Sequence, residues 1–303
     1  MKTPAEMEKY RQTILRRGVL REVPLPTDYG PPLFDWEIPP TKSWLDFCRA
    51  IRDQGPEGSC AGYGTLKVYE MEHLRLTGQQ LDTSERFCYN LAKILDEIPL
   101  DYVEQEGTTL QAAVRVLRHY GVCEEADWPY LPGDKTHLDI ARFLDILRNA
   151  RKRRIAEYRN LLKDGVNEST ITVVKQALCR RPLVCGLMVD SRWLSVSPDG
   201  FIIPGKEMIG GHAVALAFYD DELEHDGRVG WFGFVNSWSE NWGDHGIGYI
   251  PYASFLQSLL SCYELMLEGR AAGGEKDLTP NQTKCVNLTG ECALSPKSTP
   301  VSR

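Results

Sequence analysis

A change of pattern along the chain most constrains its fold. Before about residue 180, apolar residues recur at helical spacing, and the periodic segments end at glycines or polar turns. Beyond that point the apolar runs are short, rich in Val, Phe, Tyr and Ile, and separated by Gly, Asp and Pro turns. Helices that precede strands, instead of alternating with them, predict an α+β fold with a largely antiparallel sheet.

The same patterns predict where the individual elements lie. Helices are expected at residues 60–76, 84–95, 110–120, 137–152 and 171–178, and strands at 182–189, 212–219, 230–238 and 246–252. Residues 1–19 are expected to form a short amphipathic helix, and the prolines of residues 25–41 an extended, irregular path. Gly62 and Gly64 lie in the first turns of a predicted helix, where each is about 1 kcal/mol less favourable than Ala. We therefore expect another backbone or a ligand to approach this helix closely.

Length and charge exclude some classes of protein. The 303 residues suffice for one large domain or two smaller ones. The formal net charge of -7 argues against nucleic acid or an anionic membrane as the main partner. The densest basic run, residues 148–159, is compatible with a nucleic-acid patch, but the overall charge favours a solvated helix face.

The N-terminus and the cysteines bear on the cellular location. The first residues carry scattered charges and lack the apolar core of a secretory signal, and no run of about 18 apolar residues is present to span a membrane. The nine cysteines are an odd number, are widely spread and form no CxxC pair. These observations predict a soluble, cytoplasmic protein with mostly free thiols and no metal site.

The stretch DQGPEGSCAGYG, residues 53–64, places Cys60 after Gly and Ser at the expected start of a helix. A free cysteine is most often a buried packing residue. At a helix N-terminus, however, free N–H groups and the helix dipole favour the thiolate, which is the reactive form of cysteine. Cys60 is therefore either a packing residue or a nucleophile, and a nucleophile needs a base and a group that orients the base.

His212 and Asn236 are the candidates for those two roles. His212 follows two glycines at the start of a strand, where an imidazole can face an open cleft, although a loop histidine is the simpler interpretation. Asn236 ends a strand shortly before Trp238, whose indole can shield an amide–imidazole hydrogen bond from water; the simpler interpretation is a turn asparagine. The order Gln54, Cys60, His212, Asn236 along the chain favours nucleophilic catalysis over four separate structural roles.

This set of residues resembles the papain-like cysteine peptidases. The blocks QGPEGSC, GGHAV and NSWSENWGDHGIGYI carry the likeness, which extends over residues 36–267. The chain departs from the family's cysteine block because Glu57 replaces its first cysteine and Ala61 its aromatic residue. In secreted relatives that first cysteine forms a disulfide beside the active site. The usual propeptide is also lacking, so the resemblance implies an intracellular, prokaryotic-type member that either needs no zymogen or occludes its cleft with residues 1–20.

The resemblance implies a two-lobed fold with the active-site cleft between the lobes. We expect four parts in the chain: an N-terminal helix and extended strap at 1–40, a helical lobe with the nucleophile at 41–135, a β-rich lobe with the histidine and asparagine at 136–269, and a disordered tail at 270–303.

The resemblance also implies hydrolysis of peptide bonds through a thioacyl-enzyme on Cys60. His212 would protonate the leaving amine, Asn236 would orient the ring, and Gln54 would form the oxyanion hole. The residues expected to contact substrate are Gly210, Gly211 and Trp238. A polypeptide substrate is the expected partner, and no cofactor is expected. Two alternatives remain open, namely an acyl transferase or deamidase of the same fold and a catalytically silent peptide-binding relative.

Overall fold

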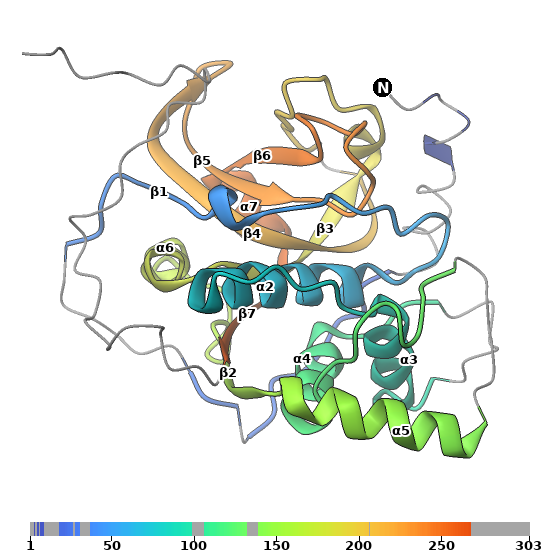
Figure 1. The fold of residues 1–303 in the computed structure, drawn as a ribbon. Coiled ribbons are helices and arrows are strands. Elements are labelled where there is room, and N and C mark those ends of the chain that lie inside the picture. The colour runs from blue at the N-terminus through green and yellow to red at the C-terminus, as the bar shows by residue number, and fades with distance from the viewer. Residues whose placement is uncertain are drawn as a thin grey trace, which may run out of the picture.

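The computed structural model describes residues 3, 5, 7–8, 18–26, 28–30, 37–98, 106–131, 139–205 and 207–267. Helix α2 (Cys60–Thr77) runs along one face of a sheet, and three further helices lie on the other side of α2 (Figure 1): α3 (Glu85–Leu95), α4 (Leu110–His119) and α5 (Ile140–Ala150). Helix α6 (Thr170–Arg180) contacts the sheet through β4, and α7 (Tyr252–Ser258) packs on β3, β5 and β6. The site described below lies where α2 meets the sheet.

The sheet is antiparallel throughout and does not close into a barrel in the described part of the chain. Its order is β2-β7-β3-β4-β5-β6, with β1 paired to β4. The bounds are β1 (Thr41–Ser43), β2 (Ile155–Asn160), β3 (Leu183–Asp190), β4 (Met208–His225), β5 (Arg228–Val235), β6 (Ile247–Pro251) and β7 (Leu259–Leu267). Helices combined with an antiparallel sheet confirm the predicted α+β class. The predicted boundaries after residues 40, 135 and 269 stay predictions.

Helix ends follow the local chemistry that predicts them. The side chains of Ser84, Thr109 and Asp139 accept hydrogen bonds from backbone N–H groups in the first turns of α3, α4 and α5. Helix α2 ends at Gly78, whose φ of 72° is the left-handed conformation that glycine adopts at low cost. Three short 3-10 helices complete the described structure: η1 (Leu45–Phe47), η2 (Arg151–Arg153) and η3 (Ser191–Ser195).

The two glycines of α2 allow the close approach that the sequence predicts. A Cβ at Gly62 would lie 3.4 Å from Tyr89 of α3. A Cβ at Gly64 would lie 3.3 Å from the backbone nitrogen of Val214 in β4, so the helix backbone rests almost directly on the strand. The first turn of α2 is thereby held against β4.

The basic run at 148–159 is only partly helical, so the prediction of a helix face is wrong for its second half. Helix α5 ends at Ala150, and strand β2 begins at Ile155 and pairs with β7. Ile155 is fully buried, and the Tyr158 ring packs edge-on against Tyr263 of β7. These apolar contacts outweigh the helical preference of the charged residues around them. Strands β1 and β7 and helix α7 are further elements that the sequence analysis did not predict.

The predicted helix over residues 1–19 is wrong at its end. Residues 5, 7 and 8 are helical, whereas Val19 is extended and forms a parallel bridge with Thr108. Residues 9–17 and the predicted tail at 270–303 lie outside the described residues.

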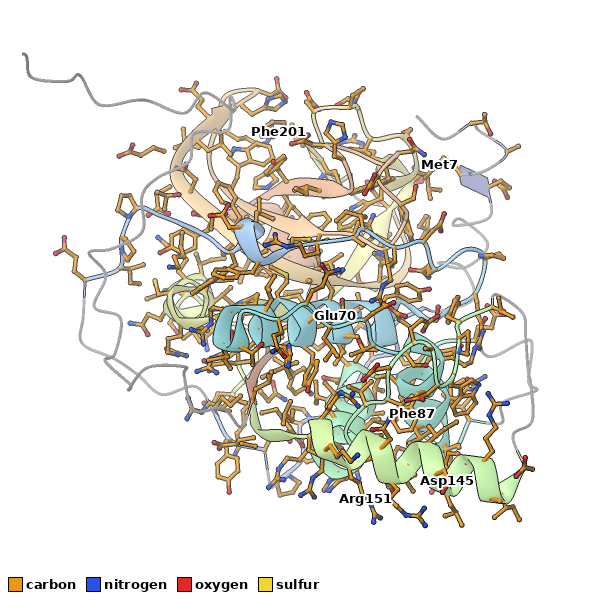
Figure 2. The ribbon with its side chains drawn as sticks, viewed as in Figure 1. Met7, Glu70, Phe87, Asp145, Arg151 and Phe201 are labelled. Atoms are coloured by element: carbon orange, nitrogen blue, oxygen red, sulfur yellow. The ribbon has the colours of Figure 1, made fainter. Side chains whose placement is uncertain are left out.

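The side chains labelled in Figure 2 show where the helices lie relative to the sheet. Figure 2 shows Glu70 on α2, between the sheet and the other helices, and Phe87 on α3. Asp145 and Arg151 lie at the outer edge of the helical side (Figure 2). In the described ranges no helix combines the length and the apolar character that crossing a membrane requires.

Candidate active site

Cys60 is the first residue of α2 and is completely buried. Burial raises the pKa of its thiol to about 12, although the backbone N–H groups of Ala213 and Ala61 hydrogen bond to the sulfur and lower it. The Ala213 N–H places the sulfur beside β4, one residue after His212. The structure therefore brings together two of the residues that the sequence analysis selected.

His212 is 1% exposed and hydrogen bonded to Asn236, with 2.8 Å between Nε2 and Oδ1. The backbone N–H of Ser237 donates to the same Oδ1 at 2.8 Å, which identifies this atom as the oxygen of the Asn236 amide. An oxygen can only accept, so Nε2 of His212 must carry the proton and Nδ1 must hold the lone pair. The hydrogen bond to Asn236 thus favours the tautomer in which Nδ1 is unprotonated and can act as a base.

Aromatic rings enclose the imidazole. The Trp238 ring lies 4.6 Å from His212 between centroids, and Trp193 meets it edge-on at 6.1 Å. Burial lowers the pKa of His212 to about 4, and the hydrogen bond to Asn236 opposes this shift only in part. Trp193, in η3, was missed by the sequence analysis, because a single tryptophan far from the motif blocks carries no signal of its own.

Gln54 is fully buried and fixed at both ends of its amide. Its Oε1 accepts a hydrogen bond from the Ser237 hydroxyl at 2.6 Å, and its Nε2 donates to the backbone oxygen of Glu57 at 2.8 Å. A primary amide has two N–H bonds, so one remains for another acceptor. Ser237 was missed as a functional residue, although it lies inside the NSW block and contacts both Gln54 and Asn236.

The N-terminal segment, residues 18–26 and 28–30, passes over the thiol. A Cβ on Gly18 would lie 2.9 Å from the Cys60 sulfur and 3.1 Å from the backbone oxygen of Gly211. The Val19 N–H donates to that same Gly211 oxygen at 3.2 Å, and the Leu20 N–H donates to the backbone oxygen of Thr108 at 3.2 Å. Residues 18–20 therefore lie over the Cys60 thiol in the described part of the chain.

Gly210 and Gly211 belong to β4 and pair with Val189 and Met188 of β3. Gly211 contacts the N-terminal segment directly, because any Cβ there would collide with the backbone of Val19. Trp238 packs on His212 as described above. The structure thus brings Gly211 and Trp238 to the site, with Gly210 next to it on the same strand.

The ionisation of the site differs from the sequence expectation. A helix N-terminus favours a thiolate, but burial has the larger effect here: the pKa of Cys60 is about 12 and that of His212 about 4. Both groups are therefore neutral at pH 7 while the N-terminal segment covers them. The expectation of a thiolate at neutral pH is wrong for this covered state.

The comparison with known families decides the affiliation of the chain. Residues 31–259 match the model described as papain family cysteine protease. The chain belongs to the papain family of cysteine proteases. Among papain-family relatives, a peptidase C1-like protein of Acanthamoeba polyphaga mimivirus is 26% identical over 66% of this chain and 63% of its own length. Cysteine proteinase 1 of Zea mays is 26% identical over 80% of this chain and 65% of its own length.

The solved structures agree on the fold. Xylellain, a cysteine protease from Xylella fastidiosa, has a TM-score of 0.70 at 23% identity and covers 83% of this chain and 97% of its own. Bromelain from Ananas comosus has a TM-score of 0.57 at 18% identity, with 76% and 100% covered. The chain spans between 56% and 65% of the length of the first curated relatives that it matches.

Glu57 has a structural role at the position where the papain-family block has a cysteine. Its two carboxylate oxygens accept hydrogen bonds from the Arg86 guanidinium of α3 at 2.7 and 2.8 Å. A two-bond pair of this kind fixes geometry as well as charge. The ion pair thus ties the loop that precedes Cys60 to α3 without a covalent link.

Proposed function

We propose that this chain is a cysteine peptidase with Cys60 as the nucleophile. The observation that carries the proposal is the position of the Cys60 sulfur at the start of α2, where it accepts a hydrogen bond from the backbone N–H of Ala213. Ala213 directly follows His212, whose ring is oriented by Asn236. Nucleophile, base and orienting group are the three parts that covalent catalysis by a thiol requires.

The reaction follows from these positions. The thiol proton passes to Nδ1 of His212, and the sulfur adds to the carbonyl carbon of a peptide bond. The imidazolium then protonates the leaving amine, which departs and leaves a thioester on Cys60. Water, deprotonated by His212, adds to the thioester, and the C–S bond then breaks to release the carboxylic acid product. The Cys60 thiolate takes the proton back from His212, which restores the starting state.

The developing oxyanion needs donors that are fixed beforehand. The Gln54 amide is supported by Ser237 and Glu57 and retains one N–H, and the backbone N–H of Cys60 lies in the first turn of α2, where N–H groups have no partner within the helix. We assign the oxyanion hole to these two groups. Polypeptides are the substrate class that this site would accept.

We also place the chain in the cytoplasm. The cysteines of the described residues are free thiols, and the ion pair of Glu57 with Arg86 stands where secreted relatives have a disulfide. A reducing compartment suits both features. Fractionation of cells that produce the chain, with thiol-state labelling of its cysteines, tests this assignment.

Labelling with an irreversible, thiol-directed peptidyl inhibitor tests the catalytic proposal. Mapping of the labelled protein should find the inhibitor on Cys60 and on none of the other cysteines, and Cys60→Ala should abolish peptide hydrolysis. Peptide hydrolysis by Cys60→Ala at the wild-type rate would disprove the proposal.

A further inference from the structure

The loop of residues 54–59, which leads into α2, is closed on itself by hydrogen bonds to one backbone oxygen. The Gln54 Nε2 donates to the backbone oxygen of Glu57 at 2.8 Å, and the Ser59 N–H donates to the same oxygen at 2.8 Å. The two N–H bonds of a primary amide lie in one plane on the same nitrogen, so an acceptor that fixes one of them also fixes the direction of the other. Whatever holds Glu57 in place therefore also orients the remaining N–H of Gln54.

The Glu57 side chain is held by Arg86 of α3. Little of this two-bond ion pair is open to water, since the Glu57 side chain is 14% exposed and that of Arg86 is 4% exposed. The Arg86 Nη2 also donates to the backbone oxygen of Leu131 at 2.7 Å. A shielded two-bond pair fixes the carboxylate in one orientation. The guanidinium thus joins the loop to α3 and to residues 128–131.

The Tyr130 hydroxyl reaches the same loop at three points. It lies 3.0 Å from the backbone oxygen of Gln54, 2.7 Å from the Ser59 hydroxyl and 3.3 Å from Oε2 of Glu57. A hydroxyl has one proton to donate, and the Gln54 and Glu57 oxygens can only accept. The Tyr130 proton therefore points to the Gln54 oxygen and, at the longer distance, to Glu57, while Ser59 donates to Tyr130.

The ring of Tyr130 is itself fixed from two sides. The Arg86 guanidinium lies over the ring, 4.5 Å from its centroid, and the Tyr63 ring of α2 meets it edge-on at 5.1 Å. Ser59 is the N-cap residue of α2 but makes no side-chain capping bond, so its hydroxyl serves the contact with Tyr130 instead. Side chains from α2, α3 and residues 128–131 thus converge on the loop that carries Gln54.

We propose that Glu57, Arg86 and Tyr130 form a clamp that orients the remaining N–H of Gln54 towards the oxyanion. Ser237 fixes the oxygen end of the Gln54 amide, and the clamp fixes its nitrogen end. Arg86 and Tyr130 are then positioning residues, which act on the reaction through Gln54. The inference rests on the proposed function, because it concerns the oxyanion hole of that same site.

Tyr130→Phe and Glu57→Gln test the clamp in the full-length protein. The first keeps the ring and removes only its hydroxyl, and the second keeps the length of the side chain but removes its charge. We expect each to lower kcat for peptide hydrolysis about tenfold with little change in KM, because a buried hydrogen bond is worth such a factor and the Gln54 donor acts in the transition state. Tyr120→Phe, at the end of α4, removes a hydroxyl that has no hydrogen-bond partner among the described residues and should keep the wild-type kcat.

Two further measurements separate the orientation of Gln54 from a general distortion of the loop. Alkylation of Cys60 by iodoacetamide displaces iodide from a saturated carbon and develops no oxyanion. The clamp variants should therefore alkylate Cys60 at the wild-type rate, as mapped by mass spectrometry. In a Gln54→Ala background the same substitutions should lower kcat no further, because the group that the clamp orients is already absent.

A wild-type kcat in both Tyr130→Phe and Glu57→Gln would overturn the inference. A tenfold loss that persists in the Gln54→Ala background, or alkylation of Cys60 that slows in step with kcat, would also overturn it.

The NMR signals of the Gln54 side-chain amide test the clamp without any need for activity. They are assigned by their disappearance in Gln54→Ala, and they should move in Tyr130→Phe and Glu57→Gln but not in Tyr120→Phe. Moved signals in a protein that hydrolyses no peptide would remove the proposed function and leave the clamp standing. Unmoved signals in an active enzyme would do the reverse.

Discussion

Ser237 connects the two halves of the candidate site at the scale of single residues. Its hydroxyl fixes the Gln54 amide and its backbone N–H fixes the Asn236 amide. In Ser237→Ala the Gln54 Oε1 loses its buried donor, and we expect kcat to fall about tenfold, since a lost hydrogen bond of this kind is worth about 1–3 kcal/mol. Steady-state peptide hydrolysis measures the effect, with Ser195→Ala as an exposed control. A kcat equal to that of the control would show that Gln54 needs no such support.

Gln54 itself should have the larger effect. Removal of one oxyanion donor typically lowers kcat by about 10² to 10³. We expect Gln54→Ala to show this loss with little change in KM, because the donor acts on charge that develops only in the transition state. Gln79→Ala removes an exposed glutamine and serves as the control. A loss confined to KM would assign Gln54 to substrate binding instead.

The sequence predicted which residues meet at the site but not their ionisation. The order of Gln54, Cys60, His212 and Asn236 was recoverable because each lies in a local block with a recognisable spacing. The raised pKa of Cys60 could not be predicted from the sequence, because it depends on burial beneath Gly18, a contact between residues far apart in the chain. Long-range coverage of this kind leaves no local pattern.

At the scale of elements, a buried carboxylate joins α6 to the sheet. Glu264 of β7 is fully buried and accepts two hydrogen bonds from Arg180 at 2.9 Å each, with Arg181 at 3.2 Å. Glu264→Ala leaves the Arg180 guanidinium without its carboxylate partner, whereas Arg181 keeps Glu72, and we expect a loss of about 3–5 kcal/mol in the free energy of unfolding. Asp145→Ala breaks an exposed pair on α5 and should lose no more than about 1 kcal/mol.

Denaturant unfolding of both variants measures these two losses. If Glu264→Ala and Asp145→Ala lose similarly little free energy of unfolding, solvent must reach Glu264 and its arginine partners, which would contradict the complete burial of Glu264. The comparison separates a buried ion pair from an exposed one within the same chain.

Glu264 also explains why part of the sheet was not predicted. Strand β7 contains Ser261 and Glu264 among its apolar residues, and both are buried. A buried charge is tolerated because Arg180 at the end of α6 and the adjacent Arg181 neutralise it, which the sequence of β7 alone does not reveal. By contrast, α2, α3 and α4 were predicted closely, because capping residues and glycine ends act locally.

At the scale of the whole molecule, the N-terminal segment that covers the Cys60 sulfur is attached to the body of the fold by two buried carboxyl groups. Glu22 accepts hydrogen bonds from Tyr263 of β7 and from the Gln111 N–H of α4, and Asp28 accepts from the Gln111 side chain and from Asn160 of β2. Glu22 has a pKa of about 7 when docked, against 4.5 for an ordinary glutamate. A raised pKa means that docking is strongest below pH 4.5, weakens as pH rises to about 7, and changes little above it. Rising pH should therefore uncover Cys60 over this window.

The Cys60 thiol also ionises with pH, so the prediction compares the wild type with Glu22→Gln, which keeps the shape of the side chain but cannot ionise. The ratio of their Cys60 labelling rates cancels the titration of the thiol itself. We expect the labelling rate of the wild type, divided by that of Glu22→Gln, to rise by up to roughly 10² between pH 4.5 and 7 and to level off above pH 7. Each pKa unit corresponds to about tenfold in the docking equilibrium. A ratio that stays constant from pH 4.5 to 9 would mean that docking of the segment does not depend on the charge of Glu22.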